Sequence, residues 1–255
     1  MKYIASCSFG KDSLAAIHCR ITHGEPIDEA VYCRIMFDDE TSAELPEHEE
    51  WIHNYAIPLL ESRYGVKITI VQSERNYCNQ FFRKFTRGKN LGRIYGFPFL
   101  IGPWCNSELK MQPMRKYFKS VGDCMQIVGI AADEEKRIQR ATVKGKILPL
   151  VEYGITEQEA FDVCRKNDLL SPAYDENRKR LGCWFCHNQR IGELRRLREE
   201  YPELWKKLLK VDKDSPVSFK PPPKKYALGV TVKDLDNRFF YETAQINFIK
   251  LLTCH

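Results

Sequence analysis

The stretch Ser8-Phe9-Gly10-Lys11-Asp12-Ser13 lies between an apolar run and a helical pattern, and this position decides the fold class. The run Tyr3–Ser8 predicts a buried strand, and apolar residues at helical spacing predict a helix over Ser13–His23. A strand, a glycine-containing turn and a helix in this order open a β-α-β fold. Backbone N–H groups at such a turn, with the positive end of the helix dipole behind them, form a cradle for an anion.

The rest of the chain repeats the alternation of strands and helices. Strands are predicted over Ala30–Phe37, Val66–Val71, Met125–Ile130 and Ile147–Val151. Helices are predicted over Pro46–Tyr64, over 156–167 behind a Thr156/Glu159 capping box, and over Ile191–Leu209 with a division at Pro202. Residues 72–120 are predicted to be irregular. We therefore expect an α/β protein with a parallel, twisted, Rossmann-like sheet flanked by helices, and a C-terminal helical lobe that contains cysteines. The expected domains are 1–175 for the α/β part, 176–220 for a cysteine-pair and basic helical lobe, and 221–255 for a linker and tail.

The composition is that of an ordinary globular protein. Of 255 residues, 43% are hydrophobic and 29% charged, and the mean hydropathy is −0.45. No apolar run reaches the roughly 18 residues that span a bilayer, and the first residues lack the apolar core of a signal peptide. A cytoplasmic protein without a membrane partner is expected. In that compartment the ten cysteines are expected to be thiols or metal ligands rather than disulfides.

Positive charge is concentrated in two regions of the chain. Residues 178–225 hold 14 Lys and Arg against 6 Asp and Glu, and residues 75–107 hold six basic residues and no acidic ones. Such stretches are typical of solvated helix faces, and equally of surfaces that bind a polyanion such as tRNA or DNA.

Three cysteines have the spacing of a metal site. Cys183 and Cys186 form a C-x-x-C pair, and Cys105 lies 78 residues before it. Three thiolates suit an iron–sulfur cluster, His187 would complete a Cys₃His zinc site, and unmetallated buried thiols are the third alternative. Cys78 lies in the acid-free stretch and fits either a core or a ligand role. Five further cysteines lie on apolar strands or helices and are expected in the core: Cys7, Cys19, Cys33, Cys124 and Cys164.

These motifs resemble those of a known family. The Ser8–Ser13 loop is similar, at five of six positions, to the S-G-G-x-D-S loop of the adenine nucleotide α-hydrolase superfamily, the PP-loop ATP pyrophosphatases, with Phe9 in place of a glycine. The cysteine layout resembles the PAPS (phosphoadenosine phosphosulfate) reductase family, whose iron–sulfur members carry C-C-x-x-[RK]-K-x-x-P and a later C-x-x-C. Here Trp104 replaces the first cysteine, and Lys110 and Pro113 keep the K-x-x-P spacing but stand one position later than in the pattern.

The resemblance implies a nucleotide site at the carboxyl ends of the strands. Lys11 and Asp12 would be catalytic, Lys11 by holding the pyrophosphate and Asp12 by holding Mg²⁺. Gly129-Ile130-Ala131-Ala132-Asp133-Glu134 resembles the family's G-x-R-x-x-E segment, but Ala131 replaces the arginine. The implied ligands of ATP are Ser8, Phe9, Gly10, Lys11, Asp12, Ser13, Phe37, Asp38, Gly129 and Glu134. The acidic residues after Phe37 fit solvated loop positions equally well.

The same resemblance implies a reaction. Cys105, Cys183 and Cys186 would hold a [4Fe-4S] cluster with one open iron that can carry sulfide, as in related tRNA thiolases. The leading hypothesis is an ATP-dependent sulfurtransferase that adenylates an acceptor and then inserts sulfur. Expected partners are an adenine nucleotide, a nucleic-acid acceptor and a sulfur donor protein or sulfide, and a homodimer is the expected assembly.

Two other functions stay open at this point. One is a PAPS or APS reductase that releases sulfite, for which Cys254-His255 matches only part of the E-C-G-x-H segment and also fits a frayed chain end. The retained Gly10-Lys11-Asp12-Ser13 favours ATP cleavage instead. The other is a non-enzymatic nucleotide-binding module with a structural zinc site.

Overall fold

A computed structural model describes residues 1–98, 103–141, 145–221 and 229–253, and the chain forms two compact units. Unit 1 comprises Met1–Glu74 and Asn106–Gly182, and unit 2 comprises Arg75–Cys105 and Cys183–His255. This division differs from the expected domain boundaries, because residues 75–105 group with the C-x-x-C pair. Cys254 and His255, proposed above as an alternative active-site segment, lie outside the described residues.

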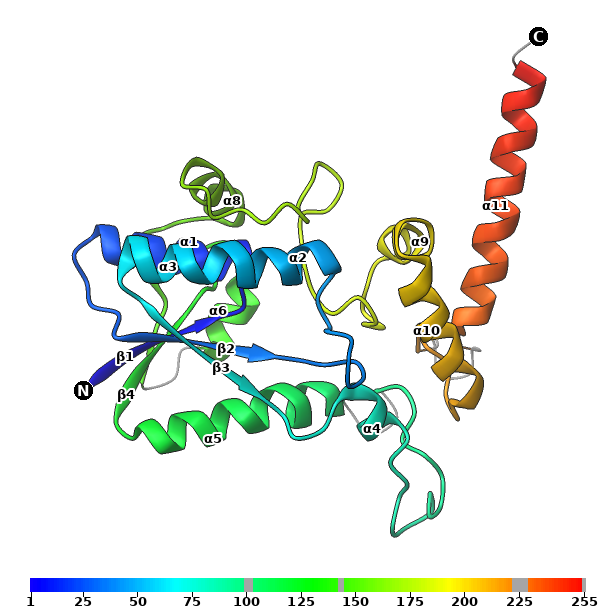
Figure 1. Cartoon of the computed structure of the whole chain (residues 1–255), viewed down its shortest axis with the longest axis horizontal. Coiled ribbons are helices and arrows are strands. Elements are labelled where there is room, and N and C mark those ends of the chain that lie inside the picture. Colours follow the sequence, from blue (N-terminus) through cyan, green and yellow to red (C-terminus); the bar gives the residue numbers. More distant parts are fainter. Residues whose placement is uncertain (99–102, 142–144, 222–228, 254–255) are drawn as a thin grey trace. The chain divides into compact units, whose positions relative to one another are not determined.

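Unit 1 is built on a five-stranded parallel sheet with the order β3-β2-β1-β4-β5. The strands are β1 (Lys2–Cys7), β2 (Glu29–Arg34), β3 (Lys67–Gln72), β4 (Cys124–Val128) and β5 (Lys146–Ile147). Helices cover the sheet on both sides (Figure 1). The expected α/β class, with a parallel sheet flanked by helices, is confirmed.

Alternating side chains of the strands supply a core to each face of the sheet. In β1, Ala5 and Cys7 join the larger core, while Ile4 packs on the opposite face with Val31 of β2 and Met114. This period of two is what a strand buried on both faces requires. The larger core includes side chains of α1 (Lys11–Thr22), α3 (Ile57–Tyr64) and α8 (Glu157–Lys166), and the smaller core includes side chains of α5 (Gln112–Val121).

Several predicted helices are confirmed with small changes. The helix predicted over Pro46–Tyr64 consists of α2 (Pro46–Trp51), a π-helical stretch η1 (Ile52–Ala56) and α3. The capping box before α8 is present, because the Thr156 hydroxyl accepts the Glu159 N–H and the Glu159 carboxylate accepts the Thr156 N–H.

Two further predictions are wrong. Only Lys146–Ile147 of the strand predicted up to Val151 pairs with the sheet, and Pro149 starts the short helix α7 (Pro149–Glu152), since proline suits a first helical turn. Residues 72–120 are not irregular throughout: they contain α4 (Tyr77–Phe81), a π-helical stretch η2 (Cys105–Met111) and most of α5. The remaining helix of unit 1 is α6 (Glu135–Ala141).

Unit 2 is helical in its C-terminal part. Pro202 divides the predicted charged helix into α9 (Ile191–Glu200) and α10 (Pro202–Asp214), as expected. The expected tail is instead a helix, α11 (Val232–Thr253). Among the described residues, no helix has both the length and the apolar character needed to cross a membrane.

Candidate functional site

The Ser8–Ser13 loop connects β1 to α1 as a turn closed by its own hydrogen bonds. The Ser13 hydroxyl donates to the Gly10 carbonyl at 2.8 Å and accepts the Ser8 N–H at 3.2 Å. Gly10 has extended backbone and caps α1, whose first residue is Lys11. The loop therefore presents the N-terminal end of α1 at the carboxyl edge of the sheet, where parallel α/β folds bind ligands.

Phe9 explains how the loop tolerates its departure from the glycine pattern. Its φ is 54°, in the left-handed region where glycine is favoured. The side chain is fully buried, and its ring lies edge-on to Tyr32 with centroids 5.0 Å apart. Burial of the ring offsets the backbone strain, so the turn keeps its shape without a glycine.

Lys11 is the central cation of the site. Its side chain is buried, and its Nζ lies 2.6 Å from Asp12 Oδ1 and 3.2 Å from Glu157 Oε1. Burial raises the pKa of Asp12, although Lys11 opposes this. Burial also disfavours the Glu157 carboxylate, but Lys11 and Arg180 outweigh it and hold the pKa of Glu157 below its usual value. Both carboxylates are thus tied to the lysine that the loop carries.

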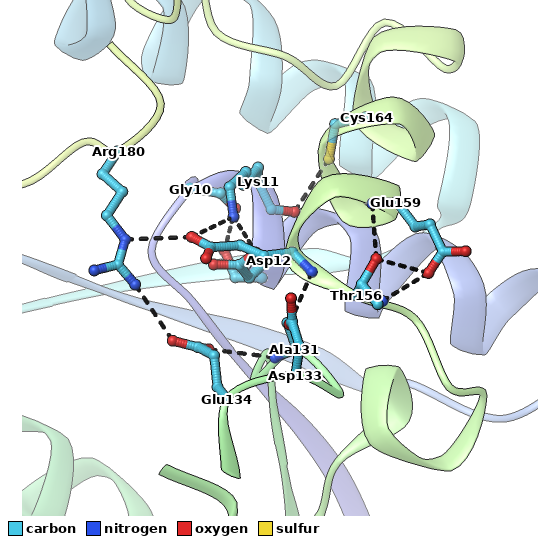
Figure 2. A network of polar contacts seen from close by, with 12 residues as sticks. Gly10, Lys11, Asp12, Ala131, Asp133, Glu134, Thr156, Glu159, Cys164 and Arg180 are labelled. Atoms are coloured by element: carbon cyan, nitrogen blue, oxygen red, sulfur yellow. Dashed lines mark hydrogen bonds and ion pairs between the residues drawn. The ribbon is translucent and has the colours of Figure 1, made fainter. Parts of the chain in front are cut away.

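Gly129 brings the end of β4 against the start of α1. A Cβ at this position would lie 2.4 Å from the Asp12 carbonyl oxygen, which no side chain tolerates. The close approach places the segment after β4 beside the Ser8–Ser13 loop, as Figure 2 shows for Ala131 and Glu134. The structure therefore brings Gly129 and Glu134 together with Lys11 and Asp12 at one edge of the sheet.

Glu134 and Arg180 extend this polar network. The Glu134 carboxylate accepts the Ala131 N–H at 3.3 Å and pairs with Arg137 at 2.6 Å. Arg180 places Nη2 3.3 Å from Glu134 Oε1 (Figure 2). Its Nε lies 3.2 Å from Glu157 Oε1. Arg180 therefore supplies a guanidinium beside the segment in which Ala131 stands for an arginine.

Sequence reasoning missed four residues that complete the site. Asp133 accepts the Glu157 N–H at 3.0 Å, and the Tyr174 hydroxyl accepts the Lys11 N–H at 3.0 Å. Glu157 pairs with Lys11, and Arg180 pairs with Glu134, as described above. Glu157, Tyr174 and Arg180 belong to no motif, and Asp133 stands at a variable position of the Gly129–Glu134 segment. The only signal in the sequence was the position of Asp133 and Glu157 after a strand and at a helix start.

The polar groups of the segment after β2, expected to lie near the adenosine, bond within the segment itself. Phe37 is buried, and Asp38 Oδ1 accepts the N–H groups of Thr41 at 2.7 Å and Glu40 at 3.1 Å. The Asp38 carboxylate thus holds its own turn. A contact of Phe37 or Asp38 with the adenosine stays a prediction.

In unit 2, three aromatic rings pack together beside the predicted metal ligands. The side chain of Asn76 accepts the Asn79 N–H at 2.7 Å and so starts α4 at Tyr77. The buried Tyr77 ring lies 4.9 Å from Trp104 and 4.3 Å from Phe185, measured between centroids. Trp104 precedes Cys105, and Phe185 lies within the C-x-x-C pair, so this packing brings the two predicted ligand segments together.

The C-x-x-C pair is a tight turn. The Cys186 N–H donates to the Cys183 carbonyl at 3.0 Å, and Lys220 Nζ donates to the carbonyls of His187 at 2.8 Å and Gln189 at 2.7 Å. Burial raises the pKa of Cys186. The positive charge of Lys220 opposes this shift and favours the Cys186 thiolate, but burial dominates.

Burial raises the pKa of Tyr77 well above its usual value, and the charges of four cysteines add to this effect: Cys105, Cys186, Cys78 and Cys183. Over the described ranges, no three Cys, His, Asp or Glu side chains are already arranged to hold one metal ion. Holding one metal ion would therefore require these cysteine side chains to adopt other rotamers. The chemistry of the donors, thiolates from converging segments, fits an iron–sulfur cluster or zinc.

Comparison with known proteins identifies the family. Two uncharacterized proteins of Methanocaldococcus jannaschii are similar to the chain. The first is 27% identical over 212 residues, which cover 78% of this chain and 39% of that protein. The second is 28% identical over 155 residues, which cover 53% of this chain and 37% of that protein. The chain therefore spans well under half the length of the curated relatives it matches. A crystal structure of PAPS reductase from Candida auris, a phosphate complex, is similar with a TM-score of 0.46 and 13% identity, over 72% of this chain and 82% of that one. The family model of the phosphoadenosine phosphosulfate reductase domain matches residues 2–189. The chain belongs to the PAPS reductase family.

Proposed function

We propose that the chain binds ATP with Mg²⁺, cleaves it to AMP and pyrophosphate while adenylating an acceptor, and then replaces the adenylate with sulfur. The observation that carries this proposal is the buried Lys11 at the start of α1, paired with Asp12 and Glu157. A cation and helix N–H groups at the carboxyl edge of a parallel sheet suit a pyrophosphate group.

The charge balance of the site supports a divalent cation. Lys11 and Arg180 are each paired with carboxylates already. A triphosphate would bring further negative charge beside Asp12, which is costly unless a cation accompanies it. Asp12 and the phosphate oxygens are the hard oxygen ligands that Mg²⁺ prefers. Asp12 is therefore proposed as the residue that holds Mg²⁺ against the nucleotide.

In the proposed first step, an acceptor oxygen attacks the α-phosphorus and pyrophosphate leaves. Lys11 and the N–H groups at the start of α1 would stabilise the charge that develops on the leaving group. Tyr174, whose hydroxyl accepts the Lys11 N–H, would yield that N–H to a phosphate oxygen. In the second step, a sulfide displaces AMP from the adenylated acceptor, and no net redox change is needed.

The sulfur step is assigned to unit 2. Cys105, Cys183 and Cys186 would hold the iron–sulfur cluster, which when bound supplies sulfide. The excess of basic residues over 178–225 supports a nucleic acid as the acceptor, because neutralising phosphates with Lys and Arg drives such binding. The alternative that family membership favours is a PAPS or APS reductase releasing sulfite.

Product analysis separates these functions. Anaerobically prepared protein would be incubated with labelled ATP, Mg²⁺ and bulk tRNA or DNA, and in parallel with PAPS or APS and a thiol. The proposal expects AMP and pyrophosphate in equal amounts, stimulated by one nucleic acid, and no sulfite. ADP as the product, or sulfite from either sulfonucleotide, would contradict it.

A further inference from the structure

Like two of the predicted metal ligands, Cys78 directly follows a residue whose aromatic ring is packed in unit 2. Tyr77 precedes Cys78, Trp104 precedes Cys105 and Phe185 precedes Cys186. The Tyr77 ring contacts both other rings, at 4.9 and 4.3 Å between centroids. Consecutive Cα atoms are about 3.8 Å apart, so three cysteines come from backbone directly adjoining the packed rings.

Cys183 completes the group through the turn that joins it to Cys186. Its carbonyl accepts the Cys186 N–H at 3.0 Å and the Gln189 side-chain amide at 3.3 Å. Cys78, Cys105, Cys183 and Cys186, here called the four-thiol site, thus come from three segments that the packing of Tyr77 on Trp104 and Phe185 joins.

The cysteines of unit 1 are placed differently. Cys164 Sγ donates to the Lys11 carbonyl at 3.1 Å, and Cys33 Sγ to the Leu109 carbonyl at 3.5 Å. Cys7 and Cys19 are buried in the core of α1 and the sheet. Among the described cysteines, those of unit 2 all belong to the four-thiol site, and those of unit 1 do not.

We propose that Cys78 is the fourth thiolate ligand of the metal held by Cys105, Cys183 and Cys186. The proposal rests on the metal site of the proposed function and refines it. Four thiolates satisfy either a [4Fe-4S] cluster or a tetrahedral zinc ion, so His187 is not required as a ligand. If the metal is an iron–sulfur cluster, Cys78 takes the position that three ligands leave open, and it must be displaced before that iron can carry sulfide.

The test compares metal binding in single variants of the full chain. Wild type, Cys78→Ala, Cys78→Ser, Cys105→Ala and His187→Ala are reconstituted anaerobically with iron and sulfide, and separately with Co²⁺ as a probe for a zinc site. Cys124→Ala, in β4 of unit 1, is the matched control. Bound metal per chain, visible absorption and the rate of loss to a chelator are measured, and circular dichroism checks that each variant is folded.

The expected results single out Cys78. Both Cys78 variants should lose metal to the chelator at least about tenfold faster than wild type, and the thiolate-to-cobalt absorption should fall by about a quarter, as one of four thiolates is lost. Cys105→Ala should be similarly impaired, whereas Cys124→Ala and His187→Ala should match wild type. If His187→Ala is impaired while both Cys78 variants match wild type, the fourth ligand is His187 and the proposal fails.

The experiment distinguishes a failure of the metal-site proposal from a failure of the proposed ATP chemistry. Wild type that binds neither an iron–sulfur cluster nor Co²⁺ would overturn the assignment of Cys78, whatever nucleotide products form. AMP and pyrophosphate measured on the same preparations test the ATP chemistry independently. A four-thiolate Co²⁺ spectrum without AMP formation would keep Cys78 as a ligand and reject the proposed function.

Discussion

The Ser8–Ser13 loop and the four-thiol site are held in place by different interactions. The loop is one continuous stretch, fixed by its own hydrogen bonds and by Gly129 against the Asp12 backbone. The four-thiol site comes from three segments, and the packing of Tyr77 on Trp104 and Phe185 joins them. A local motif of the first kind can be recognised in a sequence, whereas membership of the second kind depends on tertiary packing.

The largest effect is expected at the loop, from Asp12→Asn. The change keeps the size of the side chain but removes the charge proposed to hold Mg²⁺. Turnover of ATP to AMP should fall by about 1000-fold, whereas nucleotide affinity should change by only a few-fold, because the lost interaction acts mainly in the transition state. Steady-state kinetics and equilibrium nucleotide binding measure the two quantities.

Asp162→Asn, on the exposed side of α8, is the matched control and should leave both quantities unchanged. Equal losses of affinity and turnover in Asp12→Asn would mean that Asp12 acts in ground-state binding. Wild-type turnover would remove Asp12 from the reaction.

The second effect concerns the rings of unit 2. Tyr77→Ala removes a fully buried ring and should lower the free energy of unfolding by about 3 kcal/mol, because large-to-small changes leave a cavity. The same variant should lose metal, since the three cysteine-bearing segments lose their common contact. Urea unfolding and metal analysis are the measurements. Tyr55→Ala, at a side chain that is 40% exposed, should destabilise the protein less and leave metal binding unchanged. Metal retained at the wild-type level in Tyr77→Ala would show that the thiols do not depend on the rings.

Much of unit 1 could be predicted because its signals are local. The four longer strands, the Thr156 capping box and the turn at Ser8–Ser13 each follow from a short run of residues. The strand predicted up to Val151 was wrong because an apolar run alone does not distinguish a strand from a buried helix, and Pro149 starts a helix there. Helix α11 was missed because the proline run before it suggested a linker and tail.

The rest of the site depends on tertiary contacts that no short motif encodes. Arg180 reaches Glu134 across 46 positions, and Tyr174 reaches Lys11 across 163. Cys78 could be noted as a thiol in a basic stretch, but only the contacts of Tyr77 place it with the other three. Long-range pairs of this kind are set by how the helices and sheet pack, so one sequence alone does not show them.

A third prediction contrasts two carboxylates of unit 1. Lys11 and Arg180 overcome burial and lower the pKa of Glu157, whereas burial, with the charge of Glu49 adding to it, raises the pKa of Glu44 to about 7. The native state therefore binds the Glu44 proton more tightly than the unfolded state, and stability present at low pH is lost as the pH rises through about 7. Glu44→Gln should raise the free energy of unfolding at pH 8 by about 2 kcal/mol and have little effect near pH 5.

Urea unfolding of wild type and Glu44→Gln at both pH values tests this. Glu50→Gln, at an exposed position of α2, should show no such pH dependence. Burial lowers the pKa of the nearby His48 to about 4; its titration occurs in both proteins and cancels in the comparison. An equal effect of Glu44→Gln at the two pH values would show that burial does not control this carboxyl.

The smallest effect tests whether the loop is held by its backbone or by its one buried ring. Phe9→Ala and Phe9→Gly both remove the ring and its contact with Tyr32, so both should be destabilised. They differ at the backbone, because φ at this position is 54° and alanine keeps the strain that glycine relieves. Phe9→Gly should therefore be more stable than Phe9→Ala by about 1 kcal/mol. In Ala16→Gly, within α1, the order should reverse, with glycine less stable than alanine by about 1 kcal/mol.

Both Phe9 variants should still bind nucleotide, since the loop hydrogen bonds of Ser13 and Gly10 do not involve the ring. Urea unfolding and nucleotide binding measured on the same samples separate stability from function. If Phe9→Gly were no more stable than Phe9→Ala, the positive φ would not strain the wild-type loop. If both variants lost binding, the ring itself would shape the loop. The expected result would mean that Phe9, at a position where the pattern has glycine, strains the backbone but stabilises the loop through its buried ring. The anion cradle would keep its shape in either case.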